Sequence, residues 1–394
     1  MQRYIVVTVL TLVALALNAC GPKAADFYTQ GITQLNSYDC PNSISSFKTA
    51  SDMEFEDEGK WYPIYLMSLG ISRYYCNDLE IAISSFRAVD QYVELRSNIS
   101  ADKKALEFVK SSSQRLYQLT EREETLYHFY MGMINYKQGN FKDALIEFKK
   151  VDVIADGVYS KLPLVALARG LTYQKLGERD NALVAFRRVI EQNPFSPVGY
   201  KLAIQVETDE SNRTVFITQL KDKCGLDYVK PALDEVPVVS LIECRGEMNK
   251  EKASFQMKFD DVSSSCLIFD PVRPDFDFGA FAANVAKEVA SKVARDAMKD
   301  AAGSLIPGGS LIAGLFLGGD EADNRAWHSL PDYFVADVVY LKKDKTYSVK
   351  LENEVVGQKG SLWTGFKDQY KTVSRVVDFD VRRTDVFSTN MSSN

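Results

Sequence analysis

The stretch that decides the fold is Tyr136-Lys-Gln-Gly-Asn-Phe-Lys-Asp-Ala-Leu-Ile-Glu-Phe-Lys-Lys-Val151. Its pattern returns in Tyr173-Gln-Lys-Leu-Gly-Glu-Arg-Asp-Asn-Ala-Leu-Val-Ala-Phe-Arg-Arg-Val189. In both stretches a glycine is followed by a small alanine, and a phenylalanine comes four residues after that alanine. A glycine often ends a helix, and residues four apart lie on the same face of the next one. The two copies therefore predict an array of stacked helix pairs.

The upstream residues complete the pattern, because Gly132 and Gly170 each precede the alanine by twelve residues (132 to 144, 170 to 182). These units resemble the tetratricopeptide repeat, in which small residues let two helices approach and a phenylalanine fills the groove between units. Weaker copies precede them, and the loosest has Ser43 in place of the alanine. The signature residues are Gly70, Ala82 and Phe86, then Gly132, Ala144 and Phe148, then Gly170, Ala182 and Phe186, with Gly31, Phe47 and Ala50 in the loosest copy. We expect a helical tetratricopeptide-like solenoid over residues 25–210.

The repeat spacing is uneven. The signature phenylalanines 47, 86, 148 and 186 are 39, 62 and 38 residues apart, whereas the standard unit has about 34 residues. The longest gap therefore predicts an inserted element, which we place in a helix at 102–117.

Residues 1–19 have the composition of a signal peptide. Arg3 precedes an uncharged apolar run from Tyr4 to Leu17, which is shorter than the roughly 20 residues of a spanning helix. The run ends in Leu17-Asn-Ala-Cys20, which resembles the lipobox of bacterial lipoproteins. The resemblance implies cleavage before Cys20, acylation of its thiol and an anchor segment at 20–24, with Gly21 favouring the periplasmic face of the outer membrane. The alternative is an ordinary cleaved signal peptide or an uncleaved anchor.

Composition and motifs argue against several classes of function. Loss of Arg3 leaves 46 basic residues (47 − 1) against 53 acidic ones, a net charge of −7 (46 − 53), and such a chain is not expected to bind nucleic acid. No Gly-x-Ser-x-Gly, His-Glu-x-x-His or phosphate-binding glycine motif is present. We interpret His128 and His328 as structural, and the segment Asp270 to Asp277 as extended chain rather than a calcium loop. No cofactor, metal or enzymatic activity is expected.

The cysteines predict a disulfide. Cys40 and Cys76 fall in the turns of the first two helix pairs, and stacking of like on like would make these turns neighbours. A disulfide needs Cα atoms within about 7 Å, whereas the axes of stacked helices are about 10 Å apart. The conformation of the two turns would therefore have to bring the cysteines closer together than the helices are. An alternative that can coexist pairs Cys224 with Cys244 or Cys266. Five cysteines follow Cys20, so at least one thiol should remain unpaired.

The C-terminal half has a different pattern. The repeat is lost between residues 212 and 237, where prolines interrupt the chain, so we place the domain boundary there. β-Branched and aromatic runs predict strands at 238–245, 253–259, 265–269 and 373–381, and a hairpin from 334–341 and 346–351. The fold class expected is α+β: the solenoid, a mixed α/β domain at 237–386 and a flexible tail at 387–394.

Two further segments of this half stand out. Apolar residues every fourth position from Phe281 to Ala297 predict an amphipathic helix, packed on the sheet or lying on a membrane surface. The glycine-rich apolar run Gly303 to Gly319 is interpreted as a loop, a buried connector or a patch that contacts a partner or lipid.

The stretch Asp323-Asn-Arg-Ala-Trp327-His-Ser-Leu330-Pro331 resembles a motif of an uncharacterised family of bacterial lipoproteins with N-terminal tetratricopeptide repeats. That resemblance implies no particular activity. Trp327 and Leu330 are interpreted either as packing residues or as contacts to a partner.

The function expected is that of a lipid-anchored periplasmic scaffold, with proteins or peptides bound on the repeat surface. Its setting would be cell-wall synthesis, surface-polysaccharide export or assembly of an envelope machine. The alternatives are an enzyme that acts on wall or glycan through carboxylates of the C-terminal domain, and a carrier of a hydrophobic ligand.

Overall fold

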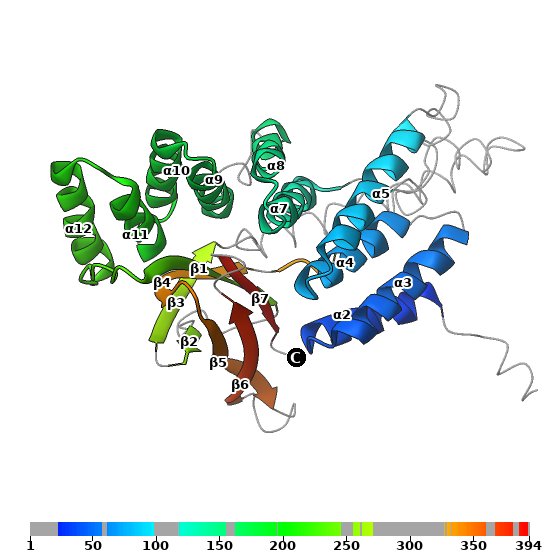
Figure 1. The fold of residues 1–394 in the computed structure, drawn as a ribbon. Coiled ribbons are helices and arrows are strands. Elements are labelled where there is room, and N and C mark those ends of the chain that lie inside the picture. Colours follow the sequence, from blue (N-terminus) through cyan, green and yellow to red (C-terminus); the bar gives the residue numbers. More distant parts are fainter. Residues whose placement is uncertain are drawn as a thin grey trace, which may run out of the picture.

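In the computed structural model, a helical array is followed by a single β-sheet (Figure 1). The structure describes residues 23–56, 61–97, 117, 119–154, 162–194, 196–245, 255–260, 262–270, 327, 329–331, 333–359, 367–380 and 386–392. The expected signal peptide and Cys20, the expected helices at 102–117 (Tyr117 excepted) and 281–297, and the run 303–319 lie outside these residues.

The described helices form five consecutive antiparallel pairs. They are α2 (Ala24–Asn36) with α3 (Cys40–Glu56), α4 (Tyr62–Tyr75) with α5 (Leu79–Ser97), α7 (Glu121–Lys137) with α8 (Phe141–Ile154), α9 (Pro163–Lys175) with α10 (Arg179–Gln192), and α11 (Pro197–Val206) with α12 (Glu210–Cys224). We call the first helix of each pair inner and the second outer. The helical array ends at Cys224 rather than at the expected residue 210. The repeat signature is absent from α11 and α12, although both helices stack on the array.

One contact recurs in the first four pairs. The signature phenylalanine of the outer helix lies directly on the glycine of its inner helix, sixteen residues earlier (31 to 47, 70 to 86, 132 to 148, 170 to 186). A Cβ added at Gly31 or Gly70 would lie 2.7 Å or 2.6 Å from the ring of its phenylalanine. All four phenylalanines are fully buried, as are Ala82, Ala144 and Ala182. Glycine is therefore required here by the close approach of an aromatic ring.

The turn between paired helices also recurs. In the first four pairs, the residue after the cap of the inner helix has positive φ: 82° at Gly139 and 76° at Gly177, but 59° at both Tyr38 and Asn77. In all four turns the next residue's N–H reaches back to a carbonyl five positions earlier, as Glu178 does to Tyr173. Glycine adopts this left-handed conformation without a Cβ penalty. The first two repeats use tyrosine and asparagine instead, which explains why their sequence match is weaker.

The strands form one seven-stranded sheet in the order β6-β5-β2-β3-β4-β1-β7. The strands are β1 (Glu235–Arg245), β2 (Phe255–Phe259), β3 (Val262–Asp270), β4 (Tyr333–Lys342), β5 (Thr346–Lys359), β6 (Lys367–Asp380) and β7 (Val386–Ser392). Figure 1 shows β1 and β4 running beneath the inner helices of the later repeats.

Two expectations for this half are wrong. The segments 334–341 and 346–351 do not pair as a hairpin: β4 pairs with β1 and β3, while β5 pairs with β2 and β6. The β2–β3 hairpin lies between them, and its turn residue Asp260 hydrogen-bonds through its backbone N–H to the carbonyl of Ser348 (3.3 Å). The expected flexible tail is also structured, since residues 387–392 belong to β7, which pairs in parallel with β1.

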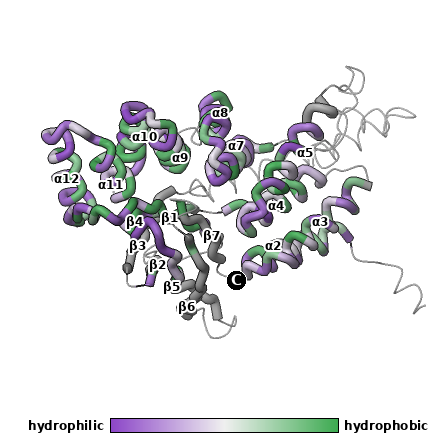
Figure 2. The backbone as a smooth tube through the Cα atoms, in the orientation of Figure 1, coloured by the Kyte–Doolittle hydropathy of each residue, from purple (hydrophilic) through white to green (hydrophobic). Residues whose placement is uncertain are grey.

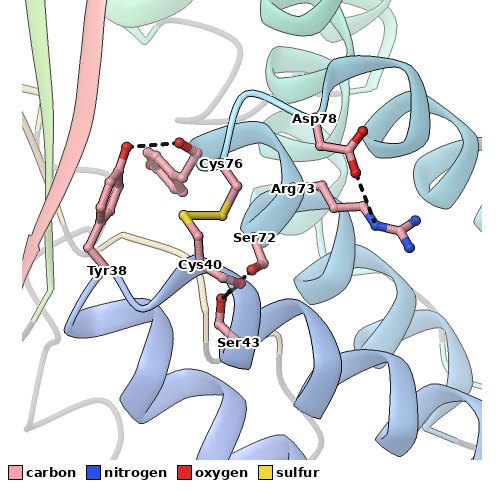
Figure 3. Close-up of a disulfide and its surroundings, with 8 residues drawn as sticks. Tyr38, Cys40, Ser43, Ser72, Arg73, Cys76 and Asp78 are labelled. Atoms are coloured by element: carbon pink, nitrogen blue, oxygen red, sulfur yellow. Dashed lines mark hydrogen bonds and ion pairs between the residues drawn. A yellow bond between two sulfur atoms is a disulfide. The ribbon is translucent and has the colours of Figure 1, made fainter. Parts of the chain in front are cut away.

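Cys40 and Cys76 are joined by a disulfide (Figure 3), and their Cα atoms are 5.6 Å apart. Ser43 lies three residues after Cys40, and Ser72 lies four residues before Cys76. Their hydroxyls are buried and 2.6 Å apart. Tyr38 donates a hydrogen bond to the carbonyl of Tyr75 (2.8 Å). The turns of the first two repeats are thus in direct contact. The alternative pairing of Cys224 involves the side chains of Cys244 and Cys266, which lie outside the described part.

The repeat core gives a direct test. Ala182→Glu places a charge in a site with no exposed surface, so we expect a loss of several kcal/mol in the free energy of unfolding. Glu178→Lys, in the exposed turn of the same repeat, should be nearly neutral. Thermal melts of both variants check this, and equal melting temperatures would contradict the placement of Ala182.

The disulfide closes a loop between residues 36 positions apart. Chain entropy predicts that the double substitution Cys40→Ala/Cys76→Ala lowers the free energy of unfolding by roughly 3–4 kcal/mol. The oxidised wild type should therefore melt above the variant, and dithiothreitol should remove the difference. Free thiols at both positions, found by non-reducing peptide mapping, would show that the bond is not made.

Candidate interaction surfaces of the repeat array

The inner and outer helices of the array have different surroundings. Every residue of α9 from Pro163 to Thr172 is buried, whereas α10 buries only Ala182, Ala185, Phe186 and Val189. The hydropathy colouring in Figure 2 shows more continuous green on α9 and α11 than on α10 and α12. An amphipathic helix buries one stripe, and a helix buried all round has neighbours on both sides. For α4, α7, α9 and α11, which are buried along most of their length, the second neighbour is the sheet or the segment 327–331 that precedes β4.

The segment 327–331 lies against the second and third repeats. The Trp327 ring is 6.1 Å from the rings of both Phe86 and Tyr130. Its backbone N–H donates to Oε1 of Glu123 (2.7 Å), and Arg122 donates to the carbonyl of Pro331 (2.5 Å). Ser329 donates to the hydroxyl of Ser68 (2.9 Å). Both ends of this segment are therefore held by side chains of the array.

Glu123 has a central position in this contact. Its carboxylate is buried and accepts hydrogen bonds from Tyr117 (2.5 Å), from the hydroxyl and N–H of Thr120 (3.0 and 2.9 Å), and from Trp327. Thr120 caps α7, and Glu123 completes the capping box. The Glu123 carboxylate thus caps α7 of the array and also binds the backbone of Trp327 in the C-terminal half.

The third repeat makes a second polar contact with the sheet. Tyr130 donates to Glu243 of β1 (2.6 Å), whose side chain is 1% exposed. The Nζ atom of Lys137, the last residue of the same helix, lies 4.3 Å from the centre of the Tyr74 ring. Burial lowers the pKa of Lys137 to about 8, although the charge of Glu243 acts in the opposite direction. Rings also meet here, since Phe129 is 5.7 Å from Phe334.

The last pair is tied to β4. Lys201 of α11 donates to Oδ1 of Asp337 (2.8 Å) and to the carbonyl of Val338 (2.9 Å). Gln205, one turn on, donates to the hydroxyl of Tyr340 (3.0 Å), and burial raises the pKa of that tyrosine to about 12. Array and sheet are therefore joined along α7 and α11 as well as through the segment 327–331.

The buried carboxylates of the described part all serve the fold. They are Glu123, Glu207, Glu243 and Asp337. Glu243 and Asp337 join the array to the sheet, and Glu123 joins it to the segment 327–331. Glu207 accepts from the N–H groups of Thr208 and Asp209 (2.9 and 3.0 Å) between α11 and α12.

Among the described residues, no group of His, Cys, Asp and Glu is placed to hold a metal ion. None of their helices is long and apolar enough to cross a bilayer.

The structure also shows where the remaining residues singled out from the sequence lie. Trp327 and Leu330 are 2% and 4% exposed, so they pack within this chain, and the idea that they contact an external partner is wrong. His128 bonds through Nδ1 to Glu147 (2.7 Å) between α7 and α8. Cys20 lies outside the described residues.

The outer helices carry a feature that the repeat signature does not include. Ile146, Val184 and Val215 are the sixth residues of α8, α10 and α12, and they are 54%, 59% and 52% exposed. We call them the outer row. The same position in α3 and α5 holds Ser45 and Ser84, both exposed. Helix packing therefore does not require an apolar residue there. The sequence alone could have shown this row by aligning the outer helices from their first residues.

Comparisons with known proteins agree with the repeat reading. The tetratricopeptide repeat model matches residues 165–196, the pair α9–α10. This pair is a tetratricopeptide repeat. The match confirms the repeat expected from the second of the two deciding stretches.

Similar solved structures include a MamA (41-end) from Desulfovibrio magneticus RS-1, at 15% identity and a TM-score of 0.39, over 53% of this chain and 97% of that one. A MamA RS-1 ArsTM double mutant gives 16% identity and 0.39, over 52% and 96%. A crystal structure of MamA protein gives 14% and 0.36, over 52% and 98%. No match is found among curated proteins.

Removal of the Trp327 ring tests whether the repeat array and the C-terminal half stabilise each other. We expect Trp327→Ala to lower the free energy of unfolding by about 3–5 kcal/mol, because it empties a site among Phe86 and Tyr130. Hydrogen exchange should speed up in α5 and α7, which carry these two rings, as well as in β4. Leu233→Ala, at a fully exposed leucine, is the control and should be neutral. Faster exchange confined to the strands would show that the array does not depend on this contact.

Proposed function

We propose that the chain is an envelope lipoprotein, anchored through acylated Cys20, that acts as a scaffold for other proteins. The anchor is supported by the order of charge, apolar run and lipobox-like residues in 1–20. The Cys40–Cys76 disulfide supports export, because disulfides persist in oxidising compartments such as the periplasm.

The observation that carries the scaffold role is the outer row. From α4 to α11 the inner face of the array, where an extended concave surface would be expected to bind a partner, is covered by the chain's own sheet and by the segment 327–331. Beyond α2, the surface left for a partner is that of the outer helices. Three successive outer helices expose an aliphatic side chain at one equivalent position. Apolar side chains aligned across neighbouring repeats are suited to bind a protein surface.

A non-enzymatic role is the simplest account of the buried acids. General acid–base chemistry on a glycan would need two carboxylates that face a substrate. The four buried carboxylates of the described part are instead bound to the protein's own N–H, hydroxyl and ammonium groups. In our proposal the protein holds partners of cell-wall synthesis, surface-polysaccharide export or another envelope assembly at the outer membrane.

Site-specific crosslinking tests the outer row. A photo-crosslinking residue at Ile146 or Val184, introduced in the native host, should yield the same protein adduct. The matched control is Ser84, which has the same position in α5 but is polar in the natural chain. Val184→Lys should then reduce the adduct from position 146, because a charge would have to be desolvated in the contact. Absence of an adduct from both positions, or equal yield from position 84, would contradict the proposal.

A further inference from the structure

One end of the first two repeats carries a cluster of aromatic rings. The ring centres of Phe55 and Tyr62 are 5.3 Å apart, and those of Tyr62 and Tyr92 are 5.6 Å apart. Trp61 stacks on Tyr65 at 6.4 Å. Phe55 is 67% exposed although its ring contacts Tyr62. We call Phe55, Trp61, Tyr62 and Tyr92 the aromatic end.

The direction of the helices fixes which part of the chain lies here. Because paired helices are antiparallel, the end of α3 and the start of α4 lie beside the start of α2. The ring contact of Tyr62 with Tyr92 places the last part of α5 there as well. In Figure 1 the ends of α3 and α5 lie on the same side of the array, on the right. The aromatic end is thus the end at which α2 begins, at Ala24.

Ala24 is four residues after Cys20. An extended chain spans at most about 3.3–3.6 Å per residue, so the two positions are no more than about 14 Å apart. An acylated Cys20 lies at the membrane surface. This end of the array is therefore held close to the bilayer, whatever path residues 21–23 take.

We propose that the aromatic end is a membrane-facing surface, with Phe55 and Trp61 in the interfacial layer of the bilayer that holds the acyl chains. The inference rests on the proposed acylation of Cys20. Aromatic residues are favoured at the interface because an apolar ring meets the acyl boundary while its polar group stays hydrated. The array then stands on the bilayer by its first two repeats, and the outer row, on the later repeats, extends away from it.

The sequence at this end is acidic, with Glu56-Asp-Glu58 directly after Phe55, so contact through anionic headgroups is disfavoured. Asp52 is paired with Lys48 (2.6 Å), and Glu54 accepts the backbone N–H of Trp61 (2.8 Å). The described residues of the aromatic end include no cluster of lysine or arginine that would attract anionic lipid. Zwitterionic lipid should therefore suffice, and added salt should have little effect.

Fluorescence quenching tests the proposal on the full acylated protein. The protein is reconstituted in phosphatidylcholine vesicles with and without brominated acyl chains, which quench tryptophan at short range. The chain has three tryptophans, so the measured quantity is the loss of quenching in Trp61→Phe. We expect wild type to be quenched, Trp61→Phe to lose most of that quenching, and Trp61→Phe/Phe55→Trp to recover it.

The matched control is Trp61→Phe/Val184→Trp, which adds a tryptophan on an outer helix at a position that is 59% exposed, against 67% at Phe55, and should not be quenched. Quenching unchanged by Trp61→Phe, or as strong from position 184 as from position 55, would overturn the proposal. The mass of the N-terminal peptide separates the two ideas. An unmodified Cys20 overturns the anchor and this inference together. Acylated Cys20 without quenching at 55 and 61 overturns only the membrane-facing surface.

Discussion

The contact between a phenylalanine of one helix and a glycine of its partner is the constraint on which the array depends. It recurs at Gly31, Gly70, Gly132 and Gly170, always with the phenylalanine sixteen residues later. A methyl group at any of these glycines would collide with the ring, and a smaller side chain than phenylalanine would leave a cavity. Both changes are destabilising in a close-packed interior. Glycine and phenylalanine therefore fix the distance between paired helices, and that distance sets the stacking of one pair on the next.

This stacking has consequences beyond the repeats. It brings the turns of the first two pairs close enough for the Cys40–Cys76 disulfide. It also aligns the inner helices into one face, which the sheet and the segment 327–331 cover from α4 onward. Because Glu123, Glu243 and Asp337 are buried where array and sheet meet, separation of the halves would leave polar groups without their partners. Such groups are costly to leave unpaired, so the covered inner face is a structural core rather than a vacant groove.

With the inner face covered, the two ends and the outer side of the array become the surfaces that distinguish this protein. Serine at the sixth position of α3 and α5, against isoleucine or valine in α8, α10 and α12, separates the first two repeats from the later ones. The exposed Phe55 and the partly buried rings beside it belong to those first repeats. In the proposed arrangement the part of the array beside the lipid anchor contacts the bilayer, and the part beyond it presents the aliphatic row to a partner.

The sequence by itself determined the local features of this protein. Helix pairs, their glycine, alanine and phenylalanine positions, the α+β class and most strands follow from patterns within about forty residues. The Cys40–Cys76 contact followed too, because stacking in a repeat array is set by neighbours. Where a local signal was disguised, the prediction weakened: Tyr38 and Asn77 take the left-handed turn that Gly139 and Gly177 take in later repeats. Only the tertiary structure decided that Trp327 binds the array, because its partner Glu123 is 204 positions away. It also decided that 386–392 is a strand and that β4 and β5 do not pair, since strand pairing joins distant segments and leaves little trace in any single one.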